Sequence, residues 1–598
     1  MKKKYALIIF VFCFLIYANS LGNSFIWDDQ AFVVHNPAIK TLLNFKYFFT
    51  DHLTTALGEL ARDVYRPITT LSYAIDYFVW ALNAFGYHLI NVIFHSLNGV
   101  LVFILLNLIF GNLSIALIGG LIFVSHPVQT EVVSWISGRS SVLFTFFYLS
   151  SFIFYIKSRK DQRRKIYLMS LILFALSIFS KEMAITLPAI LMLYDLHFAG
   201  WNRVKSRTLK YFPYFAIAAF YMCLRILLVK QVGQFVGWGS SYSTFLTMCR
   251  VLSDYVIILI WPAKLCAVGY DMPMAKSILE PHVLLSVSAI VFVLAMLPFL
   301  FKRLKTLSFS IFFFFITLLP VLNIIPIKAL KAERFLYLPS IGFCVLVSFL
   351  ILRLAKKFDK PRVGSFSIIM LVPIILIMAY GARTIIRNQD WKNEITIGRA
   401  AFEAYPACAW SITTLGQNYF ERDNYPEAIK YLEKALLYAK DYDLAHHLLG
   451  MCYLKTGRYE EAASEFRRVL EINPDSNVTV RNFLGVAYAS LGRYDEAVRQ
   501  FNIVVKMDPA FISAYLNLGR IHETKGRYGE AIKDYLKIIL NSSNSYYRAV
   551  AYMRLGDVYS AEKKFDRARE NYRKAIRELP QELAGLADII NEKLKNLP

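Results

Sequence analysis

Residues 88–110 read HLINVIFHSLNGVLVFILLNLIF, and after two further residues the chain continues at 113–125 with LSIALIGGLIFVS. Neither stretch contains Asp, Glu, Lys or Arg. A helix needs roughly 20 mostly apolar residues to cross the hydrocarbon core of a bilayer. These runs therefore predict membrane-spanning helices, and similar runs recur along residues 1–382.

The composition agrees with a membrane protein, because 56% of the 598 residues are apolar and the mean hydropathy is +0.42. The first apolar run follows three lysines and could be a cleaved signal peptide, but its length and the later spans favour a retained anchor. Spanning helices are expected near 5–21, 88–110, 113–125, 140–156, 166–179, 183–196, 211–229, 282–301, 307–322, 335–353 and 365–382. These are eleven spans of a polytopic, all-α helix bundle.

The net charge of +24 is unevenly distributed. Residues 383–598 hold 32 Lys and Arg against 28 Asp and Glu, so the positive excess lies in the membrane part. Basic residues gather in short loops, which predicts topology by the positive-inside rule and argues against nucleic-acid binding. The basic segments are the N-terminus, 157–165, 197–210, 302–305 and 353–362, and alternation places all five on the cytoplasmic side.

Residues 250–262 (RVLSDYVIILIWP) are short for a span and are interrupted by Asp254 and Pro262. A full span here would place the basic segment 302–305 outside, so we expect a re-entrant or interfacial helix. Loop 22–87 and the C-terminal part then face the same exported compartment. The seven cysteines show no metal-ligand spacing, and we assign them no chemistry.

A period close to 34 residues, the length of a tetratricopeptide repeat, runs through the C-terminal part. Leu-Gly-x-x-Tyr begins at Leu415, Leu449, Leu484 and Leu555, and Leu518-Gly519 is a further copy with His522 at the tyrosine position. Each copy continues with an alanine and then an apolar or aromatic residue, at Leu432, Phe466, Phe501, Tyr535 and Tyr572. The expected domains are 1–382 in the membrane, a helical linker 383–408, five repeats in 409–580 and a capping helix in 581–598.

Candidate functional residues all fall on the exported side of the predicted topology. Asp28 and Asp29 begin the long loop 22–87, where one of them could serve as a base or bind a metal ion. Cations that could hold a phosphate are Arg66, Arg139, Lys181 and Arg334. Other candidates are His88, His126, Glu131, Glu182 and Glu333, although Lys181-Glu182 and Glu333-Arg334 could simply be structural ion pairs.

Such a set of residues suits one kind of chemistry. A carboxylate can accept a proton from a hydroxyl, and fixed cations can stabilise a departing lipid phosphate. An apolar groove between spans can hold a polyisoprenoid tail. The combination suits transfer of a sugar from a lipid phosphate to an exported acceptor.

The motifs Trp27-Asp28-Asp29, Tyr65-Arg66-Pro67-Ile68, His126-Pro127, Gly138-Arg139, Lys181-Glu182 and Glu333-Arg334 stand in an order that resembles the transmembrane and tetratricopeptide repeat-containing O-mannosyltransferases. The resemblance covers essentially the whole chain. It implies the C-type glycosyltransferase fold, with Asp28 or Asp29 as the base and Arg66 on the donor phosphate. It also implies a polyprenyl-phosphate sugar donor, commonly mannose, and Ser or Thr hydroxyls of an exported protein as acceptor.

Short loops suggest a bacterial chain, so the expected location is the inner membrane, with the active face and the repeats periplasmic. The repeats are expected to bind the acceptor or a partner protein in their groove. Two alternatives stay open: a non-catalytic membrane scaffold, and a lipid or solute translocator. The sugar, the acceptor, the oligomeric state and any need for Mg²⁺ or Mn²⁺ are also left open.

Overall fold

The computed structural model describes residues 2–57, 64–229, 239–266, 273–327, 329–358, 371–474, 478–579 and 584–598. These residues form helices and connecting loops without a β-strand. By its internal contacts the chain divides into two compact units, Met1–Pro406 and Ala407–Pro598. The protein is therefore all-α, as the sequence predicts.

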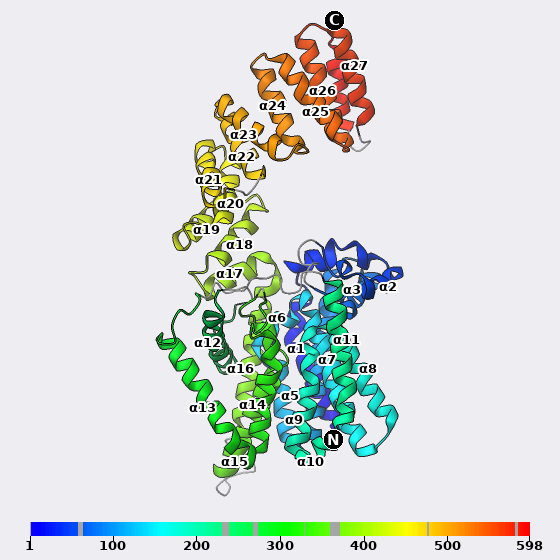
Figure 1. Ribbon diagram of the computed structural model, residues 1–598, viewed down its shortest axis with the longest axis vertical. Coiled ribbons are helices and arrows are strands. Elements are labelled where there is room, and N and C mark those ends of the chain that lie inside the picture. Colours follow the sequence, from blue (N-terminus) through cyan, green and yellow to red (C-terminus); the bar gives the residue numbers. More distant parts are fainter. Residues whose placement is uncertain are drawn as a thin grey trace. The chain divides into compact units, whose positions relative to one another are not determined.

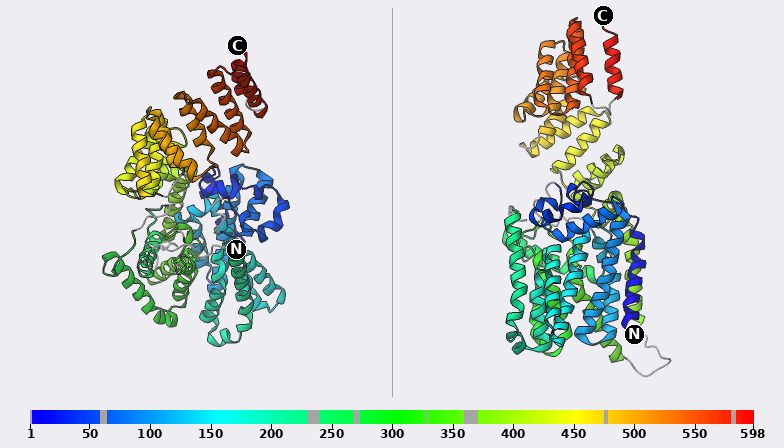
Figure 2. Two further views of the ribbon diagram at one scale, coloured as in Figure 1. Left: turned by 45° about the horizontal axis from the view of Figure 1, so that its top comes forward. Right: turned by 90° about the vertical axis from the view of Figure 1, so that its right-hand side faces the viewer.

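The first unit is a bundle of long helices that lie side by side, with the N-terminus at one end (Figures 1 and 2). Its long helices are α1 (Lys2–Tyr17), α4 (Ala84–Phe110), α5 (Leu113–Ser125), α7 (Arg139–Asp161), α8 (Arg164–Ser180), α9 (Leu187–Ala199), α11 (Thr208–Leu228), α12 (Ser241–Ile260), α13 (Pro281–Arg303), α14 (Lys305–Leu318), α15 (Ser340–Phe358) and α16 (Leu371–Asn388). Shorter helices are α2 (Phe45–Thr50), α3 (Pro67–Trp80), α6 (Thr130–Val133), α10 (Trp201–Lys205) and α17 (Glu394–Ala404).

Among the described residues, eight helices are long and apolar enough to cross a membrane. A ninth results if α5 and the segment 127–133, which are bent by 51° at His126, form one broken span. The other predicted spans correspond to shorter apolar helices, namely α8, α14 and α15. The predicted span 365–382 is observed from 371 onwards as α16, and residues 365–370 lie outside the described part.

The helix expected at residues 250–262 begins earlier than predicted. The helix there, α12, has 20 residues and begins at Ser241, so it is long enough to cross a membrane. Its contacts nevertheless keep both of its ends at one end of the bundle. Near its start Ser243 bonds to Ala275, which lies just before α13, and near its end Leu259 accepts a hydrogen bond from His126, just after α5. Since α5 ends and α13 begins at the same end of the bundle, α12 lies along that end.

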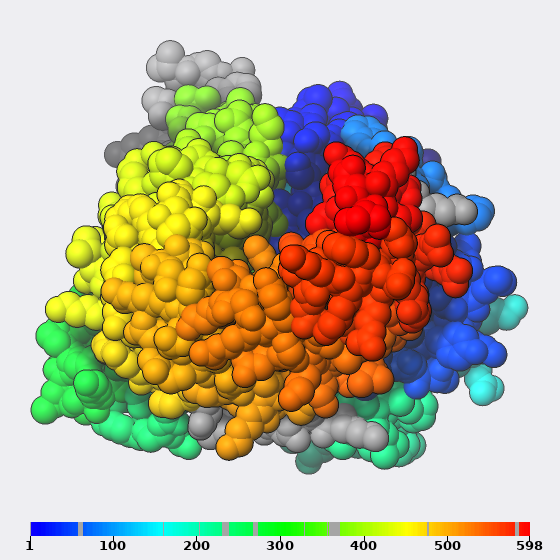
Figure 3. All heavy atoms as spheres, turned by 90° about the horizontal axis from the view of Figure 1, so that it is seen from above, coloured from blue at the N-terminus to red at the C-terminus, as the bar shows by residue number. Residues whose placement is uncertain are grey.

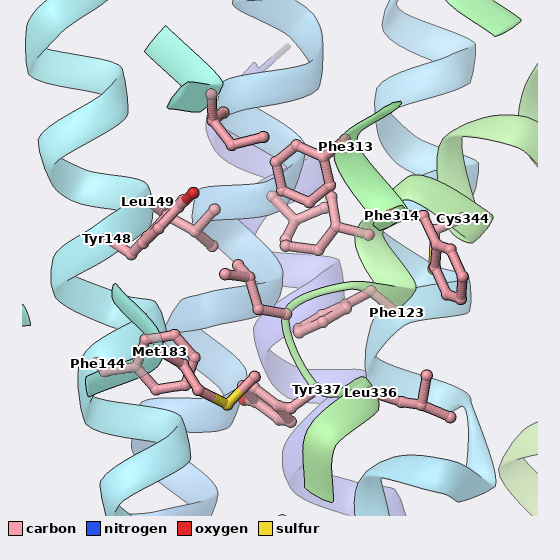
Figure 4. Packing of buried hydrophobic residues seen from close by; sticks show 14 of the residues in the cluster. Phe123, Phe144, Tyr148, Leu149, Met183, Phe313, Phe314, Leu336, Tyr337 and Cys344 are labelled. Carbon is pink, nitrogen blue, oxygen red and sulfur yellow. The ribbon is translucent and has the colours of Figure 1, made fainter. Parts of the chain in front are cut away.

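The core of the bundle is apolar and tightly packed. Phe123, Tyr337, Phe144 and Met183 come from separate elements and meet between α5, α7 and the turns near residues 183 and 337 (Figure 4). Loop 22–87 has a small core of its own, formed by Val33, Ile39, Phe48, Tyr73, Ala74, Tyr87 and Ile136. Loop 22–87 is thus a folded cap on one end of the bundle.

The second unit consists of paired helices in chain order. The pairs are α18 (Ala409–Phe420) with α19 (Tyr425–Tyr438), α20 (Asp443–Lys455) with α21 (Tyr459–Ile472), α22 (Val478–Ser490) with α23 (Tyr494–Met507), α24 (Ile512–Thr524) with α25 (Tyr528–Asn541), and α26 (Ser545–Ala561) with α27 (Phe565–Glu578). A last helix, α28 (Ala584–Lys595), packs on α27. The space-filling view in Figure 3 shows the residues of this unit side by side in chain order, from yellow through orange to red.

The spacing of glycine and large residues explains this stacking. A Cβ on Gly450 would lie 2.8 Å from the Phe466 ring, and a Cβ on Gly519 would lie 2.4 Å from the Tyr535 ring. The same relation holds in the other three pairs, for Gly416 with Leu432, Gly485 with Phe501, and Gly556 with Tyr572. Glycine lets the second helix of each pair bring its large side chain against the first, as the repeat pattern predicts. Pro580 and Leu583, which the sequence places at the end of this array, lie outside the described residues.

Candidate active site

The two adjacent aspartates have different surroundings. Asp29 is fully buried, and its Oδ2 accepts a hydrogen bond from the Ile26 backbone N–H at 3.0 Å. Its Oδ1 accepts from the Ser137 N–H at 2.8 Å and from the Ser137 hydroxyl. Burial raises the pKa of Asp29 to about 7, although these three hydrogen bonds favour the charged form. Asp29 therefore connects loop 22–87 to the turn that precedes α7.

Asp28 is only partly buried, and among the described residues its carboxylate takes part in no hydrogen bond or ion pair. Burial is the main cause that raises the pKa of Asp28, and Glu131 adds to it. The positive charges of Arg334 and Arg66 act in the opposite direction, so both guanidinium groups lie near this carboxylate. Asp28 is therefore the aspartate of the two whose carboxylate has no hydrogen-bond partner among the described residues.

An aromatic cluster fixes the backbone on which Asp28 lies. Trp27 has φ of +48°, a left-handed conformation that a bulky residue rarely adopts. Its ring packs edge-on against Trp135 and Trp391, whose rings stack with centroids 5.9 Å apart. The backbone N–H of Trp27 also donates to Glu394 Oε1 at 3.4 Å. The linker after the last bundle helix thus helps to hold the aspartate loop.

Arg66 and Glu182 form a bidentate ion pair between loop 22–87 and the turn after α8. Arg66 Nε donates to Glu182 Oε2 at 3.0 Å, and Nη2 donates to Oε1 at 2.6 Å. The side chains are 20% and 27% exposed, respectively. This pair is partly open to solvent, so a ligand can reach it without disrupting the core.

Lys181 lies beside that pair but is almost fully buried, with 4% of its surface exposed. Its Nζ donates to the Ser141 hydroxyl at 2.7 Å. Burial lowers the pKa of Lys181 to about 7, repulsion from Arg66 lowers it further, and attraction to Glu182 opposes the change. Lys181 and Glu182 therefore do not form the ion pair with each other that the sequence suggested. Lys181 donates to Ser141, and Glu182 pairs with Arg66.

Glu333 and Arg334 also have separate partners. The Glu131 carboxylate is fully buried and accepts from the Arg334 N–H at 2.7 Å and from its Nη1 at 2.5 Å. Glu333 is buried too, and Arg387 Nη2 donates to its two oxygens at 3.1 and 2.9 Å. Each ion pair joins the turn before α15 to another segment, so both pairs fix this end of the bundle.

Arg139 belongs to a fully buried network. It forms an ion pair with Asp76 at 2.7 Å, and its Nη2 donates to the Tyr87 carbonyl at 2.8 Å. Its Nε donates to Asn91 Oδ1, and the guanidinium faces the Tyr73 ring. Arg139 has no exposed surface, and its partners connect α3 to α4 and α7. This position favours a structural role over the phosphate-binding role expected from the sequence.

The histidines are likewise engaged in packing. His126 Nε2 donates to the Leu259 carbonyl at 2.9 Å, and its Nδ1 accepts from the Val128 N–H, which defines a neutral ring. His88 is fully buried beside the backbone of Asn23 and Ser24. His126 therefore joins α12 to the turn after α5, and His88 supports the chain segment that leads to the aspartates.

Several residues around the site were not identified as site residues from the sequence. Asp76, Ser137 and Asn91 carry no motif signal, because each is one polar residue in an ordinary stretch. Arg387 and Trp391 follow the last span, where a charged residue and an aromatic residue are common at the membrane surface. Only the fold shows that they reach Glu333 and Trp27.

A metal site built from both aspartates does not fit this geometry, because both oxygens of Asp29 face hydrogen-bond donors of the protein. Among the residues that the structure describes, no three His, Cys, Asp or Glu side chains are grouped as metal ligands. We therefore derive no step through Mg²⁺ or Mn²⁺.

Taken together, six charged side chains gather at one end of the bundle: Asp28, Arg66, Glu131, Lys181, Glu182 and Arg334. We call them the charged cluster. Arg66 pairs with Glu182 and Arg334 pairs with Glu131, and the charges of both arginines act on Asp28 and on Lys181. They come from four segments that are far apart in the sequence.

Comparisons with known proteins agree with both units. Tetratricopeptide repeat family models match residues 419–479, 484–546 and 549–580. Solved repeat proteins that resemble the second unit include YrrB, "a TPR protein with an unusual peptide-binding site", at 19% identity, with a TM-score of 0.28 over 33% of this chain and 97% of that one. MamA is also similar at 19% identity, with a TM-score of 0.27 over 28% of this chain and 91% of that one.

The similarity to curated proteins extends over the bundle and the repeats. The protein O-mannosyl-transferase TMTC3 of Homo sapiens is 25% identical over 77% of this chain and 54% of its own length. The protein O-mannosyl-transferase F38B6.6 of Caenorhabditis elegans is 26% identical over 71% of this chain and 62% of its own length. The chain thus spans between about half and two thirds of the length of these relatives. It is an integral membrane protein with tetratricopeptide repeats, and it is similar over its bundle and its repeats to the TMTC-family protein O-mannosyl-transferases.

Proposed function

We propose that this chain is a membrane glycosyltransferase that moves a sugar from a polyprenyl-phosphate donor to a hydroxyl group of an exported acceptor, most simply a protein Ser or Thr. One observation supports this most directly. Asp28 is an unpaired carboxylate beside the cations Arg66 and Arg334, at one end of a membrane helix bundle. The relatives named as protein O-mannosyl-transferases make mannose the first sugar to test.

In this reaction the acceptor hydroxyl oxygen attacks the anomeric carbon of the sugar. The bond between that carbon and the phosphate oxygen breaks, and the polyprenyl phosphate leaves with the bonding electron pair. Asp28 takes the hydroxyl proton, and burial, which raises its pKa, makes it a better base than an ordinary aspartate. Attack from the face opposite the phosphate inverts the anomeric configuration.

The leaving phosphate needs positive charge where its own charge develops. Arg66 and Arg334 lie near Asp28, Lys181 lies near both arginines, and in our proposal these three cations supply that charge. Arg66 and Arg334 are each partly exposed, whereas their carboxylate partners fix their positions. A cation that is held in place before the reaction stabilises the leaving group without reorganisation.

We further propose that the charged cluster and the repeats face the exported side, which is the periplasm if the chain is located in a bacterial inner membrane. The basic loops at the opposite end of the bundle support that orientation by the positive-inside rule. The repeat groove would then bind the acceptor protein or a partner. The polyprenyl tail of the donor would lie against the apolar bundle.

The test is sugar transfer by the purified full chain in detergent. Radiolabelled polyprenyl-phosphate mannose and other polyprenyl-phosphate sugars serve as donors, and exported proteins of the host serve as acceptors. Transfer of label to protein with one donor supports the proposal and identifies the sugar. A folded chain that transfers label from none of these donors would contradict it and leave the scaffold and translocator alternatives.

The buried amine of Lys181 gives this activity a predicted pH dependence. Its pKa is lowered to about 7, so the charged form that attracts phosphate is present below pH 7 and is lost above it. A hydrogen bond to a charged group is worth about 1.5–3 kcal/mol, so the donor KM should rise by about tenfold or more above pH 7. In Lys181→Arg the side chain stays charged, and the rise should be absent. The same rise in this variant would show that another group titrates.

A further inference from the structure

A second charged cluster lies at the other end of the bundle. Arg159 stands 20 residues after Arg139 on α7, which places it about 30 Å away along the helix axis. There it meets Asp195 near the end of α9 and Arg207 just before α11. We call Asp195, Tyr155, Tyr211, Arg159 and Arg207 the Asp195 cluster.

Neutral tyrosine hydroxyls donate hydrogen bonds to the Asp195 carboxylate. Asp195 is fully buried, and its Oδ2 accepts from the hydroxyls of Tyr155 and Tyr211 at 2.6 Å each. Its Oδ1 forms an ion pair with Arg159, while Arg207 Nη1 approaches Oδ2 only to 3.7 Å. Two guanidinium groups therefore share one carboxylate, and the cluster keeps a net positive charge.

Each arginine also has a donor atom that forms no hydrogen bond among the described residues. Arg159 Nε and Arg207 Nη1 are buried atoms without a hydrogen-bond partner among the described residues. The two side chains are only 16% and 12% exposed. A buried donor without an acceptor is unfavourable. An anion with several oxygens could satisfy the donors and balance the charge at once.

The surroundings place this cluster at the depth of lipid headgroups. Trp201 of the neighbouring helix α10 is 57% exposed, and exposed tryptophans mark the membrane–water interface. Leu209 and Phe212, at the start of α11, present bare apolar surface for the acyl region. Lys205 and Lys210 of the same segment are exposed and add positive charge.

The positive-inside rule by itself predicts basic residues at this end, but it predicts only an excess of Lys and Arg in the loops. It does not explain two arginines held nearly buried with their planar groups fixed by a shared carboxylate. Arginine holds phosphate through two parallel hydrogen bonds, which a diffuse lysine-rich surface cannot do. The fixed pair is therefore suited to a phosphate group.

We propose that the Asp195 cluster binds the phosphate of an anionic phospholipid in the leaflet opposite the Asp28 end. The cluster should prefer lipids with a net negative charge, such as phosphatidylglycerol, over zwitterionic phosphatidylcholine, because the cluster and its neighbours carry excess positive charge. A bound lipid would hold the ends of α7, α9 and α11 together. The role is separate from sugar transfer and does not depend on it.

The experiment uses the full chain in nanodiscs of phosphatidylcholine alone or mixed with phosphatidylglycerol. Lipid retention is read by native mass spectrometry, and the unfolding temperature is measured in both discs. The wild type should retain phosphatidylglycerol and unfold at a higher temperature in the mixed discs. Arg207→Gln should retain about fivefold less of it, since one cation near an anionic surface contributes about that factor.

Arg303→Gln is the matched control, because Arg303 is exposed at the end of α13, also at the Asp195 end of the bundle. It should leave phosphatidylglycerol retention unchanged. Equal losses in both variants would overturn the proposal in favour of diffuse surface charge. Stabilisation of the wild type by free glycerophosphate in phosphatidylcholine discs, without preference for the lipid, would overturn the lipid as the ligand.

A second variant keeps the test valid if Arg207→Gln does not fold. Asp195→Asn keeps an amide oxygen that can accept from the two tyrosine hydroxyls and removes only the charge that competes with phosphate for the arginines, so it should retain at least as much phosphatidylglycerol as the wild type. A purely structural cluster gives the opposite result. In that case Asp195→Asn would be less stable in both kinds of disc by the same amount and would lose lipid retention.

Discussion

Asp28→Asn is expected to lower the turnover number for sugar transfer by about 10²–10⁴-fold, because a positioned general base contributes roughly that factor. The amide has the same shape but cannot accept the hydroxyl proton. Since Asp28 takes part in no hydrogen bond among the described residues, the unfolding temperature and the donor KM should hardly change. Transfer to a fixed acceptor at saturating donor measures the effect.

Asp29→Asn is the matched control, since it makes the same chemical change one residue later. Its new NH₂ group would face a backbone N–H of Ile26 or Ser137, which now donate to the carboxylate. We expect a loss of about 1–3 kcal/mol in the free energy of unfolding, with more activity retained per folded molecule than in Asp28→Asn. A stable Asp29→Asn variant without activity would indicate that Asp29 is the base and that Asp28 is not.

The sequence could not distinguish the two aspartates because they are neighbours with the same side chain. Their difference arises from Ser137, which lies 108 residues away and reaches only Asp29. The polar turn that supplies Ser137 carries no signal that it folds back onto the first loop. Long-range hydrogen bonds of this kind depend on tertiary structure alone.

Features with a regular period were predicted well. The repeats follow from Gly450 and Phe466 and their equivalents, because a close helix approach needs a small residue facing a large one at a fixed spacing. The bundle helices follow from the length of their apolar runs. The start of α12 was wrong because its first turn is polar, although the Ser240 side chain caps the helix there. Asp254, which the sequence suggested as an interruption, forms an ion pair with Lys331 and is accommodated in the helix.

Charged residues near the membrane were found readily, but their partners were not. Adjacent opposite charges such as Glu333-Arg334 suggested local pairs, yet a helical turn directs neighbouring side chains to different sides. The two residues therefore pair with Arg387 and Glu131, respectively. The ion pairs of this protein connect segments rather than neighbours, and this property fixes the charged cluster in space.

Arg139→Met is expected to have the largest effect on stability. The substitution leaves the Asp76 carboxylate buried without its partner and removes donors from Asn91 and the Tyr87 carbonyl. Removing one partner of a buried ion pair costs about 3–5 kcal/mol. Denaturant unfolding in detergent should show this loss, and the yield of folded protein should fall.

Arg66→Met provides the contrast, because the ion pair of Arg66 with Glu182 is partly exposed. It should lose less stability than Arg139→Met but should raise the donor KM, since Arg66 faces the proposed phosphate. Asp76→Asn combined with Arg139→Met should recover part of the lost stability, because the double variant no longer buries an uncompensated charge. If Arg139→Met instead kept its stability and raised the donor KM, Arg139 would bind the donor phosphate, and the buried network around it would have to open during the reaction.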